Sequence, residues 1–150
     1  MPLALLTTLA LGLGTVAAPT ATAGDGYRGT LLRMLNRTRE RHDLKPLAIH
    51  RELSKDARTH TRRMIREDRV FDPPNLQQIL APYPWDEIGA AVVGCASTVR
   101  RLHRAWMHSD LHREILLHPK LRKVGIGPIR NDDRNACGRG SIWGTQLLFG

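Results

Sequence analysis

The sequence predicts a single small domain of the α+β class, and three observations support this prediction. The chain has 150 residues, a length that suits one hydrophobic core. Apolar residues recur at three- and four-residue spacing in several segments, which indicates helices, and alternate by two near the C-terminus, which indicates strands. The order of these patterns is helices, a strand, helices and a terminal hairpin, which favours an α+β or a layered αβα fold.

An uncharged apolar segment opens the chain. Residues 3–18 contain no charged side chain, and the small residues Ala21-Thr22-Ala23 follow at the spacing of a signal-peptide cleavage site. The run is too short and too rich in Gly and Thr to predict a membrane span. No Lys or Arg precedes it, which is atypical of an export signal, so a buried N-terminal helix is the alternative. We expect residues 1–23 to be a signal peptide and residues 24–150 to form the secreted, extracellular domain.

Two amphipathic helices are predicted next. The first covers residues 29–41, after a flexible start at 24–27, and the second covers residues 51–68. The stretch Leu44-Lys45-Pro46-Leu47 separates them, because proline lacks the amide hydrogen that a helix interior needs. Each helix has one apolar face, made of Leu31, Leu32, Leu35 and Thr38 in the first helix and of Leu53, Ala57, His60 and Met64 in the second.

The middle of the chain combines irregular and regular segments. Pro73-Pro74-Asn75 marks an irregular segment, and residues 77–81 suit one short turn. The small apolar residues 88–94 predict a buried strand. Ser97 or Thr98 is positioned to cap the third helix. The apolar face of that helix consists of Val99, Leu102, Ala105 and Trp106.

The C-terminal part is predicted to hold a fourth helix and a strand pair. Asp110 is placed to cap this short helix, and Pro119 prevents its continuation. Residues 123–127 and parts of residues 141–149 alternate by two, as strands do. The polar, Gly-containing segment 131–140 between them suits a hairpin connection.

The chain is strongly basic, with 23 Lys and Arg against 14 Asp and Glu and a formal net charge of +9. Such a charge favours contact with polyanions such as anionic cell-wall polymers or acidic membranes, although a solvated basic surface is the simpler interpretation. Aromatic residues are few and are not interleaved with the basic ones, so no specific nucleic-acid site is predicted. The densest basic stretches are Arg58, Arg62, Arg63 and Arg66 in the second helix and Arg100, Arg101 and Arg104 in the third.

The two cysteines, Cys95 and Cys137, are expected to form a disulfide in an exported chain. The bond would close a loop of about 40 residues and, on the chain-entropy account, stabilise the domain by roughly 4 kcal/mol. Two free buried thiols are the alternative. A structural zinc site of the usual spacing is not predicted, because no histidine cluster accompanies the cysteines.

Several groups of residues follow one another in an order that is specific as a set. They are Leu35-Asn36-Arg37-Thr38-Arg39-Glu40-Arg41 with Leu44-Lys45-Pro46-Leu47, then Leu53, Ala57, His60 and Met64, then Ala105-Trp106-Met107-His108-Ser109 with His112-Arg113 and Leu116-Leu117-His118-Pro119, then Val124-Gly125-Ile126-Gly127 and Trp143-Gly144-Thr145-Gln146. Together they cover about residues 29–149. The set resembles the bacterial, SCP-like extracellular branch of the CAP superfamily (cysteine-rich secretory, antigen 5 and pathogenesis-related proteins). The resemblance implies a three-layer αβα sandwich with a small antiparallel sheet.

The resemblance also implies a cleft that holds up to two histidines and two glutamates. His112 matches one of the histidines. Asp72 stands where the other is found, in the stretch Phe71-Asp72-Pro73-Pro74-Asn75. Ala90 replaces one glutamate, and Ser109 stands at the position of the second, as in many bacterial members. The cleft of this chain is therefore predicted to be degenerate.

Some chemistry is compatible with the residues that are left. Two histidines flanked by carboxylates can hold a divalent metal or carry out acid–base chemistry. His112 and Asp72 alone could form a hydrogen-bonded pair, and weak zinc binding would need a third ligand such as His60 or Glu87. The structural alternatives are a helix-end role for His112, a turn cap for Asp72 and a core position for His60.

These observations favour a secreted binding protein with a degenerate cleft and no resident cofactor. The family resemblance implies lipid, sterol or cell-wall glycan ligands. The second hypothesis is a metal-assisted or His/carboxylate hydrolase that acts on cell-wall or peptide substrates, and Ala90 in place of a glutamate argues against it. No serine lies in a Gly-x-Ser-x-Gly stretch, so a serine hydrolase is not predicted.

Overall fold

The structure is a computed structural model that describes the backbone from residue 23 and the side chains from residue 26, both to residue 150. The predicted signal peptide therefore lies, apart from Ala23, outside the described residues. Among the helices of residues 23–150, none combines the length and the apolar character that a membrane crossing requires. The regular elements, in chain order, are α1 (Ala23–Glu40), β1 (Ala48–Ile49), α2 (Arg51–Arg66), α3 (Leu76–Leu80), β2 (Gly89–Ala96), α4 (Val99–His108), α5 (Asp110–Leu116), β3 (Lys123–Ile126), β4 (Ile129–Asn131) and β5 (Ser141–Phe149).

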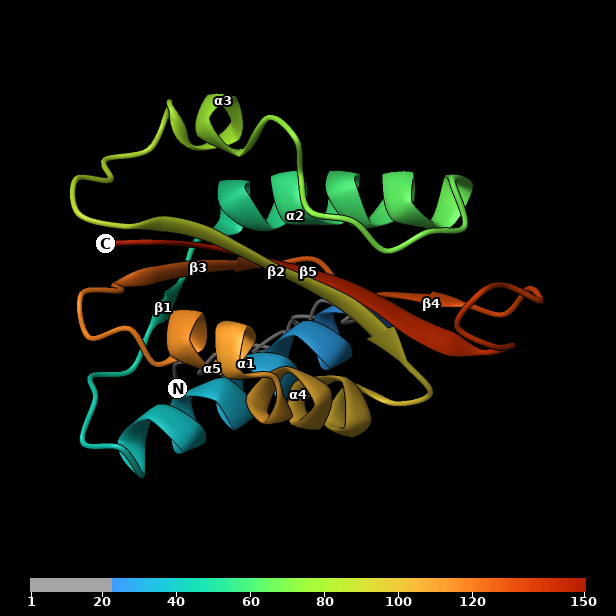
Figure 1. Cartoon of the computed structure of the whole chain (residues 1–150), viewed down its shortest axis with the longest axis horizontal. Helices are drawn as coiled ribbons and strands as arrows, with labels where there is room; N and C mark the ends of the chain where they lie inside the picture. Colours follow the sequence, from blue (N-terminus) through green and yellow to red (C-terminus); the bar gives the residue numbers. More distant parts are fainter. Residues whose placement is uncertain (1–22) are drawn as a thin grey trace, which may run out of the picture.

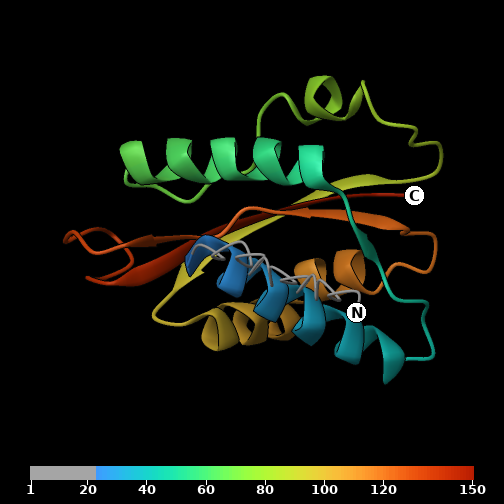
Figure 2. The same ribbon diagram turned by 180° about the vertical axis from the view of Figure 1, so that it is seen from behind.

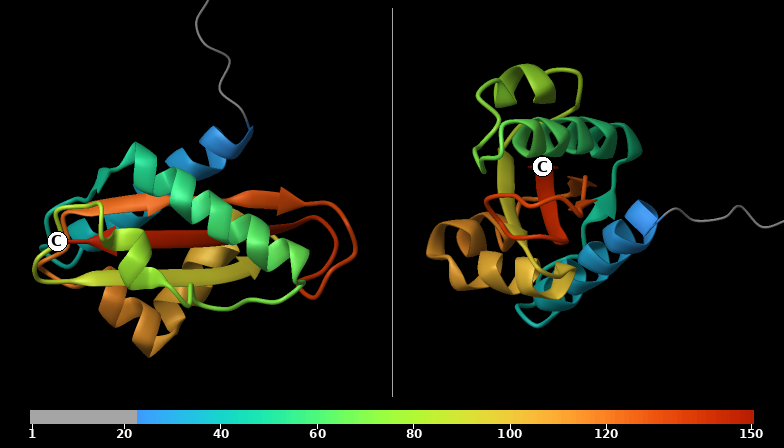
Figure 3. Two further views of the ribbon diagram at one scale, coloured as in Figure 1. Left: turned by 90° about the horizontal axis from the view of Figure 1, so that it is seen from above. Right: turned by 90° about the vertical axis from the view of Figure 1, so that its right-hand side faces the viewer.

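These elements form three layers, which confirms the predicted α+β sandwich (Figure 1). α2 and α3 cover one face of the sheet, and α1, α4 and α5 cover the other. Figures 2 and 3 show the same division from behind, from above and from the side. We refer to the two helical layers as the α2–α3 layer and the α1–α4–α5 layer.

The sheet is small and mostly antiparallel. Its strand order is β1-β3-β5-β2, and β4 also pairs with β5. β5 is the central strand, and it runs antiparallel to β2, β3 and β4. β1 pairs with β3 in parallel, so this two-residue edge departs from the antiparallel pairing of the rest of the sheet. Helices on both faces separate β1 from β3 along the chain, and no tight hairpin therefore fixes their relative direction.

Apolar side chains fill the space on both sides of β5. Leu148 packs into the core cluster that includes residues of α1, α4 and α5, whereas Leu147 and Phe149 pack with Leu53 and Ala57 of α2. This alternation is the two-residue period of a strand. Every residue of β5 is buried, because helices cover both faces of the sheet at its centre.

The first helix is longer than the sequence predicts. It begins at Ala23, so the expected flexible start over residues 24–27 is wrong. Glycines at 24 and 26 lower the intrinsic helix propensity of this segment. Tyr27 packs against the core cluster, and this contact favours the helical conformation despite the glycines.

Two capping predictions have different outcomes. Thr98 caps α4, because its side chain accepts a hydrogen bond from the backbone N–H of Arg101 at 3.1 Å. Asp110 does not cap α5: Ser109 occupies the N-cap position, and Asp110 lies in the first helical turn. The reason is that α4 and α5 are joined without a connecting loop, and Ser109 is at once the C-cap of α4 and the N-cap of α5.

The expected connection over residues 131–140 is shorter than predicted. Residues Ile129–Asn131 form β4, which pairs with β5, and the connection starts after Asn131. α2 likewise ends at Arg66, two residues before the expected end, and Asp68 adopts a left-handed conformation with φ 46°. A left-handed residue of this kind commonly follows the end of a helix.

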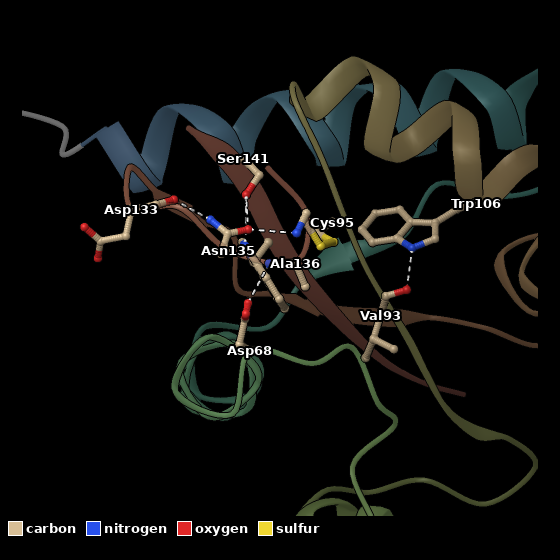
Figure 4. The surroundings of a disulfide bond; sticks show 10 residues. Asp68, Val93, Cys95, Trp106, Asp133, Asn135, Ala136 and Ser141 are labelled. Atoms are coloured by element: carbon tan, nitrogen blue, oxygen red, sulfur yellow. Dashed lines mark hydrogen bonds between the residues drawn. A yellow bond between two sulfur atoms is a disulfide. The ribbon is translucent and has the colours of Figure 1, made fainter. Parts of the chain in front are cut away.

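The predicted disulfide between Cys95 and Cys137 is present, with Cα atoms 6.1 Å apart (Figure 4). It joins β2 to the connection between β4 and β5. Asn135 shapes this connection, because its Oδ1 accepts a hydrogen bond from the backbone N–H of Cys137 at 2.9 Å. The backbone N–H of Ala136 donates to Asp68 at 2.8 Å, which ties the same connection to the end of α2.

Candidate functional site

His112, which the family resemblance matches to one of the two cleft histidines, lies in α5. The helix is held in the α1–α4–α5 layer by Leu116, whose side chain is fully buried in the core cluster. His112 itself is half-buried, and no hydrogen bond or ion pair joins its imidazole to the part of the chain that the structure describes. The structural alternative of an imidazole bonded to the backbone is therefore not observed, and both ring nitrogens are available to a ligand.

Ser109 sets the position of α5 relative to α4. Its backbone N–H is 3.2 Å from the carbonyl oxygens of both Ala105 and Trp106, which closes α4. Its carbonyl oxygen then accepts a hydrogen bond from the N–H of Arg113 at 2.8 Å, which opens α5. The half-buried side chain makes no capping bond, so the hydroxyl is not committed to the backbone.

Ala90 occupies the strand position at which the family resemblance places a glutamate. It pairs with Leu148 of β5, and residues that pair across two antiparallel strands share one face of the sheet. Leu148 belongs to the core cluster that also holds Leu116 of α5, so Ala90 faces the layer that contains His112. The alanine is only 8 % exposed. This position thus contributes a buried methyl group, which can neither transfer a proton nor hold a metal.

Asp72 lies in the connection between α2 and α3, which belongs to the layer opposite α5 (Figure 1). Its side chain is exposed, between a half-buried Phe71 and a buried Pro73. Phe71 anchors this segment, because the guanidinium of Arg69 lies 4.7 Å from the centre of its ring. In residues 23–150, no hydrogen bond joins Asp72 to His112, so the pair considered from the sequence is not formed in this structure.

His60 lies at the core side of α2 and is 6 % exposed. Its Nε2 is 2.8 Å from the carbonyl oxygen of Phe71 and must donate, since a carbonyl oxygen can only accept. The two rings also meet edge to face, with centroids 5.1 Å apart. These contacts fix the segment after α2 and fit the core role that was the structural alternative for His60.

One edge of His60 also lines a groove of about 210 Å³ between α2 and α3, together with Asp56, Thr59, Arg63, Arg66, Asn75 and Ile79. The only carboxylate in the lining of this groove is that of Asp56, and it accepts a hydrogen bond from the hydroxyl of Tyr83. Burial and this carboxylate raise the pKa of Tyr83 above its usual range, because both disfavour the phenolate. His60 thus lies in the α2–α3 layer, on the other side of the sheet from His112. The groove offers polar contacts, and its one carboxylate is already hydrogen-bonded.

Glu87 lies outside both of these regions. Its carboxylate forms an ion pair with Lys120 at 3.1 Å, and the neighbouring Asp86 pairs with Arg122 at 3.0 Å. Both pairs are exposed and line a surface groove of about 370 Å³ beside Gly150. The structure therefore places Glu87 in a surface ion pair and does not bring it to His112.

The predicted candidate residues do not converge on a metal site. Within residues 23–150, no group of three or more His, Cys, Asp or Glu side chains is arranged so that it could hold a metal ion. Zinc sites in proteins generally use three or four protein ligands. The positions that the family resemblance assigns to a cleft thus hold an imidazole without a partner, an uncommitted hydroxyl and a buried methyl group in one layer, and the exposed carboxylate of Asp72 in the other.

Three buried polar side chains are not identified as functional candidates by the sequence. Arg39 is completely buried and donates to the carbonyl oxygens of Lys45 at 2.9 Å and of Leu116 at 2.8 Å, so it ties α1 to α5. Burial lowers its pKa. His103 and Gln146 are also buried and keep polar atoms without a partner in the described chain. Of the three, only His103 has a signal of burial in the sequence, because it lies four residues after Val99 on the apolar face of α4.

The three-layer fold is that of an SCP-like α+β domain, of the type found in extracellular proteins. A family model described as the cysteine-rich secretory protein family, CAP, matches residues 32–146. The chain belongs to this family. The match spans most of the sandwich, from α1 to β5.

Individual relatives agree with this assignment. The chain is 27 % identical over 144 residues to YkwD, an uncharacterized protein of Bacillus subtilis (strain 168), and the match covers 89 % of this chain and 51 % of YkwD. The chain thus spans about half the length of this curated relative.

Solved structures show the same fold. An extracellular protein containing a SCP domain from Bacillus anthracis str. Ames superimposes with a TM-score of 0.67 at 19 % identity, over 88 % of this chain and 45 % of that one. An outer surface protein from Borrelia burgdorferi superimposes with a TM-score of 0.66 at 15 % identity, and the match covers 86 % of this chain and 95 % of that one. A cysteine-rich secretory protein from Staphylococcus aureus subsp. aureus Mu50 superimposes with a TM-score of 0.67 at 25 % identity, and the match covers 87 % of this chain and 41 % of that one.

Proposed function

We propose that this chain is an exported CAP domain that binds a ligand without catalysing its turnover. The observation that carries the proposal is Ala90, a buried methyl group at the position of a family glutamate, on the sheet face that α5 covers. General acid–base catalysis needs a proton donor and acceptor within about 3 Å of the reacting atoms. Among the described residues His112 has no carboxylate partner, which leaves a single imidazole for this task.

Export is part of this proposal. Residues 3–18 and the small residues before Gly24 have the pattern of a signal peptide. The disulfide between Cys95 and Cys137 is typical of oxidising compartments outside the cytosol. Three structural relatives are described as an extracellular protein, an outer surface protein and a cysteine-rich secretory protein. We expect the protein recovered from culture medium to begin at Gly24, which N-terminal sequencing would test.

The ligand classes that the family resemblance implies are lipids, sterols and cell-wall glycans. The formal net charge of +9 favours an anionic cell-surface partner among them, because it raises the local concentration of anions and speeds their association. At the site itself, the free imidazole of His112 and the hydroxyl of Ser109 provide hydrogen bonds to such a ligand. Uncharged ligands would be recognised through these polar contacts alone.

The experiment incubates the purified protein with isolated bacterial cell walls, separates the walls by sedimentation and analyses the supernatant by mass spectrometry. We expect the protein to sediment with the walls while the supernatant contains no more glycan or peptide fragments than a protein-free control. His112→Ala should weaken sedimentation, and Glu87→Ala, which removes only a surface ion pair, should not.

The hydrolase is the second candidate function, because the unpaired His112 is the one family residue that is kept. Release of wall fragments by the native protein that disappears in His112→Ala would support the hydrolase and refute the binding module. Absence of sedimentation, together with no affinity for vesicles that contain lipids or sterols, would also refute the binding proposal.

A further inference from the structure

A second polar site lies away from the family cleft, between α1 and α4. The two helices pack side by side in the α1–α4–α5 layer (Figure 2). Side chains of these helices, of the turn after α1 and of α5 line an open groove of about 380 Å³, which we call the α1–α4 groove. It is lined by Met34, Thr38, Arg41, His42, Arg100, His103, Arg104, Met107 and Arg113. None of the positions that the family resemblance assigns to the cleft belongs to this lining.

The lining of the α1–α4 groove is entirely cationic or uncharged. It holds four arginines and no Asp or Glu. Arg113 is partly neutralised, since its Nη2 lies 2.7 Å from the carboxylate of Asp110. Arg100 and Arg104 form no ion pair with any residue of the described chain. An anion bound between these guanidinium groups would relieve their mutual repulsion.

The floor of the groove is built from buried polar side chains. Thr38 is 6 % exposed and His103 is 7 % exposed. The Thr38 hydroxyl donates to the carbonyl oxygen of Met34 at 2.9 Å, accepts from Nη2 of Arg41 at 3.1 Å and lies 3.1 Å from Nε2 of His103. Because the hydroxyl has a single proton, Nε2 of His103 must carry the proton of their hydrogen bond.

This assignment leaves Nδ1 of His103 as an acceptor without a donor. The atom is buried and has no partner in residues 26–150. Burial and the charge of Arg41 lower the pKa of His103 to about 4, so the imidazole is neutral at pH 7. Buried acceptors are normally satisfied, and a donor that enters the groove could satisfy this one only if the side chains that cover it move apart.

We propose that the α1–α4 groove binds a phosphate monoester. Its terminal oxygens can accept from several guanidinium groups at once, and arginine forks match phosphate geometry. A monoester or hydrogen phosphate also keeps an O–H near neutral pH for part of the population, which can donate to Nδ1 of His103 once the side chains that cover this buried atom move apart. Sulfate has a similar shape and charge but lacks this proton, so the floor should discriminate between the two anions. The proposal does not depend on what the family cleft binds.

The test is isothermal titration of the purified protein with inorganic phosphate and, at equal ionic strength, with sulfate. We expect saturable binding of phosphate that is several-fold tighter than that of sulfate. The double variant Arg100→Gln/Arg104→Gln should weaken phosphate binding at least tenfold. Both side chains are exposed, so thermal unfolding of the variant should match that of the native protein.

A matched control removes two arginines from the opposite layer. Arg51 and Arg62 of α2 are exposed and form no ion pair in the described chain. Arg51→Gln/Arg62→Gln should change phosphate affinity by less than twofold. An equal loss in both double variants would show diffuse electrostatic attraction and overturn the proposal. Equal affinities for phosphate and sulfate, or no saturable binding of either, would also overturn it.

Two further arms locate the phosphate source and the site. Flotation compares the binding of the protein to vesicles that contain phosphatidic acid with its binding to vesicles of phosphatidylcholine alone. Binding to the phosphatidic acid vesicles that Arg100→Gln/Arg104→Gln removes would identify a monoester carried by a lipid. Binding of inorganic phosphate without vesicle binding identifies a free anion, and either result supports the groove. His112→Ala should leave phosphate affinity unchanged; a loss in this variant would place the ligand at the family cleft and contradict the assignment.

Discussion

Gln146 lies in the middle of β5 with a fully buried side chain, and neither its amide nitrogen nor its amide oxygen has a partner in the described chain. Its strand neighbours are Val92 on one side and Ile126 on the other, both in the core. An unsatisfied buried amide destabilises the folded state, so we expect Gln146→Met to raise the free energy of unfolding by about 1–3 kcal/mol. Urea denaturation would measure the change.

The neighbouring Thr145 provides the control for this prediction. Its Oγ1 lies 2.9 Å from the hydroxyl of Thr61 in α2, and both side chains are fully buried. Thr145→Val breaks this bond and should lower the free energy of unfolding by about 1 kcal/mol. A loss of stability in Gln146→Met as well would mean that the native amide is satisfied by an internal water or a ligand.

His103 predicts a specific response to acid. Its pKa is about 4 in the folded protein against 6.5 for an unperturbed histidine, so the unfolded chain binds a proton first as the pH falls. The stability that its neutral form contributes is present above pH 6.5 and is lost between pH 6.5 and pH 4. His103→Gln should reduce this acid-induced loss by up to about 3 kcal/mol, measured by denaturation at pH 7 and pH 4.5. An identical pH dependence in both proteins would contradict the pKa shift.

The chemistry of these single residues could not be read from the sequence. The environment of His103 depends on Thr38, which lies 65 residues away and reaches it only through the packing of α1 on α4. The buried state of Gln146 depends on three strands pairing in one register. The cleft positions His112, Asp72 and Ala90 could be named from the sequence, but their separation into two layers required the fold.

At the scale of elements, two glycines allow α2 to pack closely on the sheet. A Cβ atom on Gly125 would collide with the backbone of Leu53, and one on Gly127 would collide with the backbone at Ala57 and Arg58. Backbone atoms cannot move aside as a flexible side chain can, so we expect Gly125→Ala to lower the free energy of unfolding by about 1–3 kcal/mol. Thermal and urea denaturation would measure the loss.

Gly26 is the matched control for this packing argument. It lies in α1, and a Cβ atom there would meet nothing within 4 Å. Gly26→Ala should be neutral or stabilise the protein by up to about 1 kcal/mol, because alanine favours the helix. Equal losses in Gly26→Ala and Gly125→Ala would contradict the close approach of α2 to β3.

The disulfide should stabilise the edge at which β2 meets the connection from β4 to β5. We expect Cys95→Ala/Cys137→Ala to lower the free energy of unfolding by roughly 2–4 kcal/mol, because the bond restricts the unfolded chain. Reduction of the native protein should produce a similar loss. Two free thiols in the native protein, detected by mass spectrometry without reductant, would contradict the bond.

The elements that the sequence predicts best are those with a long periodic pattern. Leu53, Ala57 and Met64 share one face at helical spacing, and all three are fully buried in α2 as expected. β4 has three residues and β1 has two, and such short segments cannot show a reliable alternation. Their pairing, including the parallel direction of β1, follows from where the helices bring the chain.

At the scale of the whole molecule, the sandwich of the family is present, and we propose that its cleft is degenerate. The family match runs through α1 to β5, and the core clusters fill both sides of the sheet. The family positions, by contrast, hold His112, Asp72, Ser109 and Ala90. We therefore propose that this scaffold serves recognition, because binding needs the shape and polar contacts of a site but not proton transfer.

Zinc binding, measured by isothermal titration, tests the loss of the cleft chemistry most directly. The native protein and His112→Ala would be compared under identical conditions. Since zinc needs about three protein ligands, we expect no stoichiometric binding by either protein. Tight binding of one zinc ion by the native protein, abolished in His112→Ala, would contradict the account.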